Sequence, residues 1–175
     1  MKLREPYSTI LYIVFGVLLA FGINGGLALA LSTDLPIVAV ESNSMNTNNP
    51  PPFPGKPGSF AKGDILVLRG VWGYEVGDVI VFTHTEGTTP VVHRLIQINQ
   101  DGTYQTKGDA NTNQLPFEKR ILPEQVHGKV TLIVPHLGWI KIGMTEFILP
   151  NVMWLAGIII FLYIIGVGIT KLWRD

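Results

Sequence analysis

Two long apolar runs bracket the polar middle of this 175-residue chain. The first lies within residues 8–31 and the second within residues 147–170, and neither contains a charged side chain. About 20 consecutive apolar residues are needed to cross the hydrocarbon core of a bilayer. We therefore predict transmembrane helices over residues 8–31 and 147–170, separated by a domain of residues 32–146.

A cleaved signal peptide is the alternative interpretation of the first run. A basic start precedes the run, and Ala28-Leu29-Ala30 near its end is similar to a cleavage site. The apolar core of a signal peptide is typically about 7 to 15 residues long, and this run is longer. The length favours a retained anchor.

Basic residues flank the outer end of each run. Lys2 and Arg4 lie in residues 1–7, and Lys171 and Arg174 lie in residues 171–175. Loops rich in lysine and arginine stay on the cytoplasmic side of a membrane. Both termini are therefore expected in the cytoplasm, which places residues 32–146 outside it or in a lumen.

The middle region is patterned as short strands. Runs of β-branched or apolar residues alternate with Gly, Asp, Asn and Pro, which is typical of strands joined by turns; the runs cover residues 65–68, 79–82, 91–98 and 130–134. Asn99-Gln100-Asp101-Gly102 predicts a hairpin turn between residues 91–98 and 103–107. Gly63-Asp64 and Gly77-Asp78 each precede a run and predict turns.

Residues 46–60 differ from the rest of the middle region. Five prolines within this segment remove backbone donors that a sheet would need, so we expect an exposed, partly polyproline loop. A spacer and a flap that contacts a substrate or partner both fit this composition, and the spacer is the simpler interpretation.

Composition excludes several classes of function. The 13 basic and 13 acidic side chains balance, so no net field favours nucleic acid. The absence of cysteine excludes thiolate chemistry and Cys-ligated metals. The four histidines match no compact zinc spacing; they are His84, His93, His127 and His136. We expect no metal and no cofactor, and we expect the histidines other than His93 on loops or strand edges.

A hydroxyl, an imidazole and a carboxylate follow one another along the middle region. Ser44, His93 and Asp109 each lie in a distinct local motif. Serine becomes a nucleophile when histidine takes its proton, and a carboxylate that accepts from the imidazole fixes its tautomer. A lysine base, Lys62 or Lys107, is an alternative, although it would need burial to stay neutral near pH 7. Ser44 follows the first run so closely that we expect it near the membrane surface.

Five ordered motifs resemble those of type I signal peptidases. They are Ser42-Asn43-Ser44-Met45, Lys62-Gly63-Asp64, residues 76–82, Val92-His93-Arg94 and Lys107-Gly108-Asp109-Ala110-Asn111. The match is similar to the archaeal and endoplasmic-reticulum branch, in which histidine replaces the lysine base of the bacterial branch. The two-anchor layout favours an archaeal plasma membrane.

This resemblance implies a fold and a function. The fold would be a mainly β catalytic domain of the signal peptidase kind, flanked by N- and C-terminal transmembrane helices. The chain would be a membrane-bound serine endopeptidase that removes signal peptides from preproteins after small residues, alone or with other membrane subunits. Ser44 would be the nucleophile, His93 the base and Asp109 the acid, with the Ser44 N–H and the Ser42 hydroxyl in the oxyanion hole.

The acid departs from the family pattern. Many members carry a second aspartate six residues after the Gly-Asp aspartate, and this chain has Leu115 there. Either Asp109 suffices or Glu118 substitutes, and we expect Asp109.

A noncatalytic function is the main alternative. A membrane-anchored β domain could instead bind partners in a secretion or envelope complex, with Ser44 as a turn residue. In that case Ser44 and His93 would each be dispensable.

Overall fold

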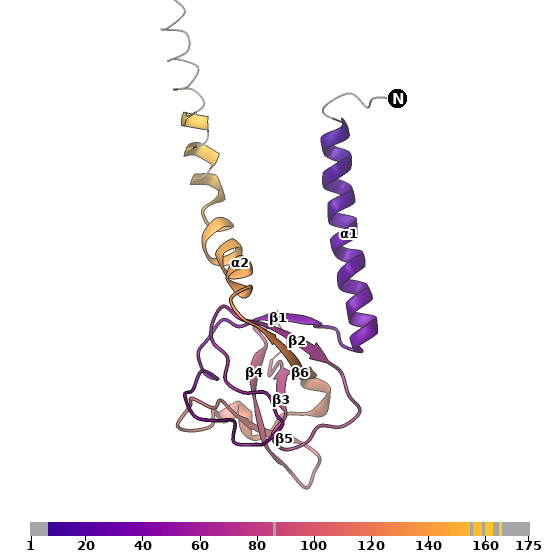
Figure 1. The fold of residues 1–175 in the computed structure, drawn as a ribbon, viewed down its shortest axis with the longest axis vertical. Helices are drawn as coiled ribbons and strands as arrows, with labels where there is room; N and C mark the ends of the chain where they lie inside the picture. Colours follow the sequence, from indigo (N-terminus) through magenta and orange to yellow (C-terminus); the bar gives the residue numbers. More distant parts are fainter. Residues whose placement is uncertain (1–6, 86, 155, 159, 163–164, 166–175) are drawn as a thin grey trace, which may run out of the picture.

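The computed structural model describes residues 7–85, 87–154, 156–158, 160–162 and 165. Helix α1 (Tyr7–Leu31) leads into a β domain, and helical segments follow the domain (Figure 1). The remaining elements are β1 (Ile37–Ala39), β2 (Ile65–Arg69), β3 (Val79–Phe82), β4 (Val91–Ile98), β5 (Tyr104–Lys107), the 3-10 helices η1 (Pro116–Lys119) and η2 (Pro123–Gln125), β6 (Val126–Val134), α2 (Gly138–Ile142) and the π-helix η3 (Gly143–Ile148).

The six strands form one antiparallel sheet in the order β1-β2-β6-β3-β4-β5. The strand predictions for β2 through β5 and the hairpin between β4 and β5 are confirmed. Strand β6 begins four residues before the predicted run, because Gly128 and Lys129 pair with β3 without being apolar and His127 lies at a bulge between paired residues. Strand β1 is not among the predicted strands, although Ile37-Val38-Ala39-Val40 is an apolar run rich in β-branched residues like the others.

The sheet is covered by apolar side chains on both faces. All four residues of β3 are buried, because alternate side chains point to opposite faces. Val79 and Val81 pack with Met45 and Leu66 in one cluster, whereas Ile80 packs with other residues in a second cluster. This burial fixes the register of β4, which carries His93 beside Ile80.

The two Gly-Asp turns have the predicted structural role. Gly63 and Gly77 have positive φ angles of 95° and 98°, a conformation that glycine adopts without steric cost. Asp78 then accepts from the backbone N–H of Glu75, and Asp64 accepts from Ala61 in the same way. Each carboxylate closes the turn just before a strand.

The proline-rich loop forms no strand, as predicted, but its second half is attached to the domain. The Lys56 ammonium lies 2.9 Å from carboxylate oxygens of both Glu75 and Asp78. The carbonyl of Pro57 accepts a hydrogen bond of 2.9 Å from buried Arg94. Only the first half of the loop therefore resembles a free spacer.

Helix α1 is long and apolar enough to cross a membrane. It has 25 residues, a length of about 38 Å, and buries none of them within the protein. Gly138–Ile148 and Val152–Leu162 meet at a bend of 75° and would provide a second crossing only if they form one span. Helical structure thus begins at Gly138, before the predicted start at residue 147. The end of the predicted 147–170 helix and both predicted cytoplasmic termini, apart from Tyr7, lie outside the described residues.

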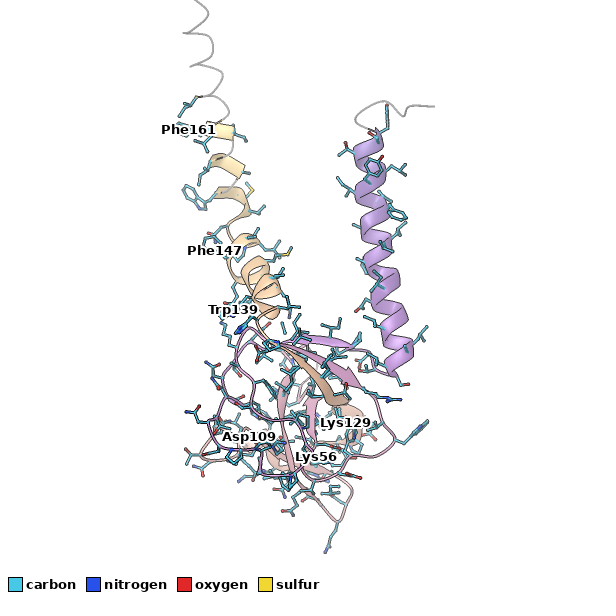
Figure 2. The ribbon with its side chains drawn as sticks, in the orientation of Figure 1. Lys56, Asp109, Lys129, Trp139, Phe147 and Phe161 are labelled. Atoms are coloured by element: carbon cyan, nitrogen blue, oxygen red, sulfur yellow. The ribbon has the colours of Figure 1, made fainter. Side chains whose placement is uncertain are left out.

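Both helical segments extend from the same side of the β domain (Figure 1). Trp139 lies where the C-terminal segments meet the domain, with Phe147 and Phe161 farther along them (Figure 2). The backbone N–H of Gly138 donates to the carbonyl of Gly63, and Ile142 is buried. Helix α2 is therefore anchored to the turn that precedes β2.

Candidate active site

Ser44 lies in a turn that several segments hold in place. Its carbonyl accepts from the N–H of Ala110 at 2.9 Å, and the next side chain, Met45, is buried in the core. The amide oxygen of Asn43 accepts from the N–H of Lys62 at 2.9 Å. These bonds fix the backbone on both sides of Ser44, so its hydroxyl has a defined position.

The hydroxyl of Ser44 meets the imidazole of His93. Ser44 Oγ lies 2.8 Å from Nε2 of His93, which is 3% exposed. A Cβ atom at Gly108 would lie 2.9 Å from that nitrogen and 2.7 Å from the Ser44 carbonyl oxygen. Glycine at position 108 therefore leaves the space in which the serine and the histidine meet.

Glu118 holds the other side of the imidazole. Its Oε1 forms a short hydrogen bond with Nδ1 of His93 and also accepts from the hydroxyl of Thr106 at 3.0 Å. Its Oε2 accepts from the N–H of Leu115 at 2.6 Å. This carboxylate is completely buried, so the protein donors replace its hydration.

These donors determine the ionisation of Glu118. Burial alone would raise the pKa of its carboxyl group, but the hydrogen bonds from His93, Leu115 and Thr106 outweigh burial and hold the pKa below its ordinary value. An ionised Glu118 accepts a hydrogen bond from the protonated Nδ1 of His93. The lone pair of Nε2 then faces Ser44. The arrangement orients histidine to accept the serine proton.

Asp109 does not contact His93. Its carboxylate instead receives three hydrogen bonds from Nε and Nη2 of Arg94, the shortest being 2.6 Å from Nη2. Arg94 also donates to the carbonyls of Gly77 and Pro57. The predicted preference for Asp109 as the partner of the imidazole thus disagrees with the geometry, and the alternative, Glu118, occupies that position.

The alternation of side chains explains this difference. His93 and Arg94 are consecutive on β4 and therefore point to opposite faces of the sheet. The register pairs Arg94 with Lys107, so Asp109, two residues farther along, lies on the side of Arg94. Thr106 has the opposite parity and shares the side of His93 with Glu118. The register shifts by one residue at a bulge between Leu95 and Gln97; without this bulge, the pairing that starts at Ile98 and Tyr104 would have placed His93 opposite Asp109.

The remaining predicted residues lie around this centre. Ser42 Oγ is 3.2 Å from Ser44 Oγ. Neither alternative lysine base contacts Ser44: Lys62 pairs with Glu146, and Lys107 donates to the carbonyl of Asn111. Among the described residues, no three His, Cys, Asp or Glu side chains are grouped to hold a metal ion.

A cleft of about 470 Å³ opens beside Ser44 and His93. Its walls are mainly apolar and come from residues 35–40 and from Pro90, Val91 and Val92. Glu41 and Lys141 line it as well and form an ion pair of 3.2 Å. The cleft therefore extends from the turn that carries Ser44 to helix α2.

No protein-family model matches the chain, but curated relatives do. It is 32% identical over 161 residues to the signal peptidase complex catalytic subunit SEC11 of Lachancea thermotolerans, covering 83% of this chain and 88% of that protein. The subunit of the same name from Saccharomyces cerevisiae is 33% identical over 158 residues, covering 83% and 87%. That from Zygosaccharomyces rouxii is 29% identical over 160 residues, with the same coverage. These yeast relatives give no support to the prediction of an archaeal type.

Proposed function

This chain belongs to the family of signal peptidase complex catalytic subunits, and we propose that it is a membrane-bound serine endopeptidase in which Ser44, His93 and Glu118 carry the reaction. The observation that supports this proposal best is the continuous hydrogen-bond chain from the Ser44 hydroxyl through the imidazole to the buried carboxylate. Such a chain is the arrangement that activates serine in unrelated hydrolases.

The reaction begins with proton transfer to His93. Its Nε2 takes the hydroxyl proton as Ser44 Oγ attacks the scissile carbonyl carbon, and Glu118 stabilises the imidazolium that forms. The imidazolium then protonates the leaving amine, so the peptide bond breaks and an acyl-enzyme remains. Water attacks the ester in the second half, with His93 again accepting the proton. No cofactor takes part in this sequence.

The oxyanion hole is assigned to the Ser44 N–H and the Ser42 hydroxyl. The Ser44 N–H donates to no group within the described part of the chain, and the Ser42 hydroxyl lies 3.2 Å from the attacking oxygen. Both donors would bind the negative oxygen of the tetrahedral intermediate more strongly than the ground-state carbonyl, which lowers the barrier.

The substrate binds in the cleft as an extended peptide. Strand β1 is at the end of the sheet, so one of its edges is unpaired. Strand β4 pairs with β5 only from Arg94 onward, which leaves the same kind of edge at Val91–His93. A peptide lying between these edges would add main-chain hydrogen bonds. Shallow apolar walls suit the small residues that precede the cut in signal peptides.

The topology is part of the proposal. Residues 8–31 and 147–170 span the bilayer, residues 1–7 and 171–175 lie in the cytoplasm, and residues 32–146 act outside it or in a lumen. This orientation follows the positive-inside rule for the basic termini. Other membrane subunits would accompany the chain, since the relatives carry the name of a complex.

Cleavage of a purified preprotein in liposomes tests the function. We expect the wild type to cut after the small residue at position −1, and His93→Ala to lose the activity without losing insertion. His93→Lys tests whether a lysine can replace the base. Undiminished cleavage by His93→Ala would reject the serine-histidine mechanism, whereas a wild type that is inactive even with its partner subunits present would favour the noncatalytic alternative.

A further inference from the structure

Asn111 lines the active-site cleft together with Ser44 and His93. Hydrogen bonds fix its backbone: its N–H donates to the carbonyl of Gly108 at 3.0 Å, and its carbonyl accepts from the ammonium of Lys107 at 2.6 Å. The side-chain amide, in contrast, makes no hydrogen bond to any residue that the structure describes. The protein thus holds this amide in place and leaves its donors and its acceptor for a molecule in the cleft.

The amide lies close to the nitrogen of His93 that takes part in proton transfer. A Cβ atom at Gly108 would lie 2.8 Å from Nδ2 of Asn111 and 2.9 Å from Nε2 of His93. The two nitrogens are therefore at most about 5.7 Å apart, and one water molecule with hydrogen bonds of about 2.9 Å can bridge such a separation. Any larger residue at position 108 would displace one of the two groups.

The second half of the proposed reaction needs a water molecule beside this nitrogen. Once Ser44 is acylated, its oxygen carries no proton, so Nε2 of His93 can accept one from water. A water held by Nε2 alone turns about a single hydrogen bond, whereas a second contact fixes its oxygen relative to the ester carbon. Fixing the orientation of a reactant in this way accelerates its reaction.

We propose that Asn111 is a further catalytic residue, which binds the water that hydrolyses the acyl-enzyme. The inference rests on the proposed function, because it requires an acyl group on Ser44. Nδ2 of Asn111 donates to one lone pair of the water, and the water gives a proton to Nε2 of His93. The second lone pair forms the bond to the ester carbon. The tetrahedral intermediate then collapses, the bond from carbon to Ser44 Oγ breaks, and the imidazolium returns the proton to Oγ.

An ester substrate separates the two halves of the reaction. A p-nitrophenyl ester of a short peptide that ends in alanine acylates Ser44 rapidly, so the initial burst of nitrophenol measures acylation and the later steady rate measures hydrolysis of the acyl-enzyme. The full chain is assayed in liposomes with its partner subunits. Asn111→Leu keeps most of the side-chain volume and removes the amide, so the burst should be unchanged. The steady rate should fall by about ten- to a hundredfold, because the water is no longer oriented.

Asn113→Leu is the matched control. Asn113 lies in the same loop, is exposed and is not among the residues that line the cleft, so its substitution should change neither the burst nor the steady rate. Asn111→Ala, which removes the amide without adding an apolar group of similar size, should behave as Asn111→Leu does.

Two results would overturn the inference. One is a wild-type steady rate in both Asn111 variants, and the other is an equal fall of burst and steady rate in both, since a purely structural role would slow both halves. A wild type that cleaves neither the ester nor a preprotein would instead reject the proposed function.

Discussion

The described residues contain two hydroxyl–imidazole–carboxylate chains that have the same distance between hydroxyl and imidazole but very different surroundings. Ser44 and Thr83 each lie 2.8 Å from a histidine Nε2. The Glu118 side chain behind His93 is 0% exposed, whereas the Asp34 side chain behind His127 is 67% exposed. Distance alone therefore does not identify the catalytic chain.

Burial separates the two chains chemically. A charge pair shielded from water interacts more strongly than the same pair in solvent, so Glu118 can stabilise an imidazolium that Asp34 would stabilise only weakly. Glu118 also has two further donors that fix its position, Thr106 and Leu115. We assign proton transfer to the buried chain.

Removal of the two hydroxyl groups should give the largest contrast. Ser44→Ala is expected to lower the rate of preprotein cleavage by about four orders of magnitude or more, because the nucleophile is lost. Thr83→Val should change it by less than about tenfold. Single-turnover assays of both variants in the same liposomes measure the contrast. Comparable losses would mean that the exposed chain takes part in the chemistry.

Removal of the acid should have the next largest effect. Glu118→Gln is expected to lower kcat by about 10³- to 10⁴-fold, because the amide permits the wrong imidazole tautomer and cannot stabilise the imidazolium. Asp109→Asn, assayed at a temperature at which it is folded, should cost far less. If the two variants exchanged these effects, Asp109 would be the acid and the described position of Glu118 would not represent the active state.

Stability should distinguish the buried ion pair from the exposed one. Asp109→Asn leaves the buried guanidinium of Arg94 without its counter-charge, which typically costs about 3–5 kcal/mol. The melting temperature in detergent should fall by at least about 10 °C. Asp34→Asn, at an exposed pair, should cost about 1 kcal/mol or less. Equal shifts would show that burial does not decide the strength of these pairs.

Acid titration should give the smallest effect. Because the folded protein lowers the pKa of Glu118 below its ordinary 4.5, this carboxylate stabilises the fold at higher pH, and the contribution is lost as the pH falls from about 4.5 through the folded pKa. The same holds for Asp78. Burial raises the pKa of its carboxyl group, but the hydrogen bond from the Glu75 N–H and the charges of Lys56 and Lys129 outweigh burial and lower the pKa below 3.8. Between about pH 5 and pH 3, the melting temperature of Glu118→Gln should depend less on pH than that of the wild type. A curve of unchanged slope would contradict this linkage.

Local pattern was enough to predict much of the fold. The runs that became β3 and β4 are bounded by turn residues and are buried by the sheet, so propensity and tertiary structure agree. The sequence also predicted that Ser44 and His93 act together, and the structure places Ser44 Oγ 2.8 Å from Nε2 of His93. Strand β1 was not predicted, although Ile37-Val38-Ala39-Val40 has the same apolar, β-branched pattern, and it pairs with β2.

The preference for Asp109 over the alternative Glu118 as the partner of His93 disagrees with the geometry for a different reason. Asp109 stands in a motif that presents a carboxylate, and proximity along the hairpin made it the expected partner of His93. The choice between Asp109 and Glu118 depended on the face of the sheet on which each side chain lies. Asp109 lies on the face opposite His93, where Arg94 donates a hydrogen bond to it. Glu118 contacts His93 from the 3-10 helix η1. No local sequence pattern encodes the position of this helix relative to the hairpin.

The arrangement of the helical segments on one side of the sheet also bears on how tightly the cleft must hold its substrate (Figure 1). With α1 in a bilayer, enzyme and substrate search for each other in two dimensions. Once both are held in the same membrane, binding of the substrate in the cleft becomes almost intramolecular. Tethering of this kind gives effective concentrations of about a millimolar. A cleft with weak intrinsic affinity can then be filled, and a cleaved mature protein, no longer tethered, departs without delay.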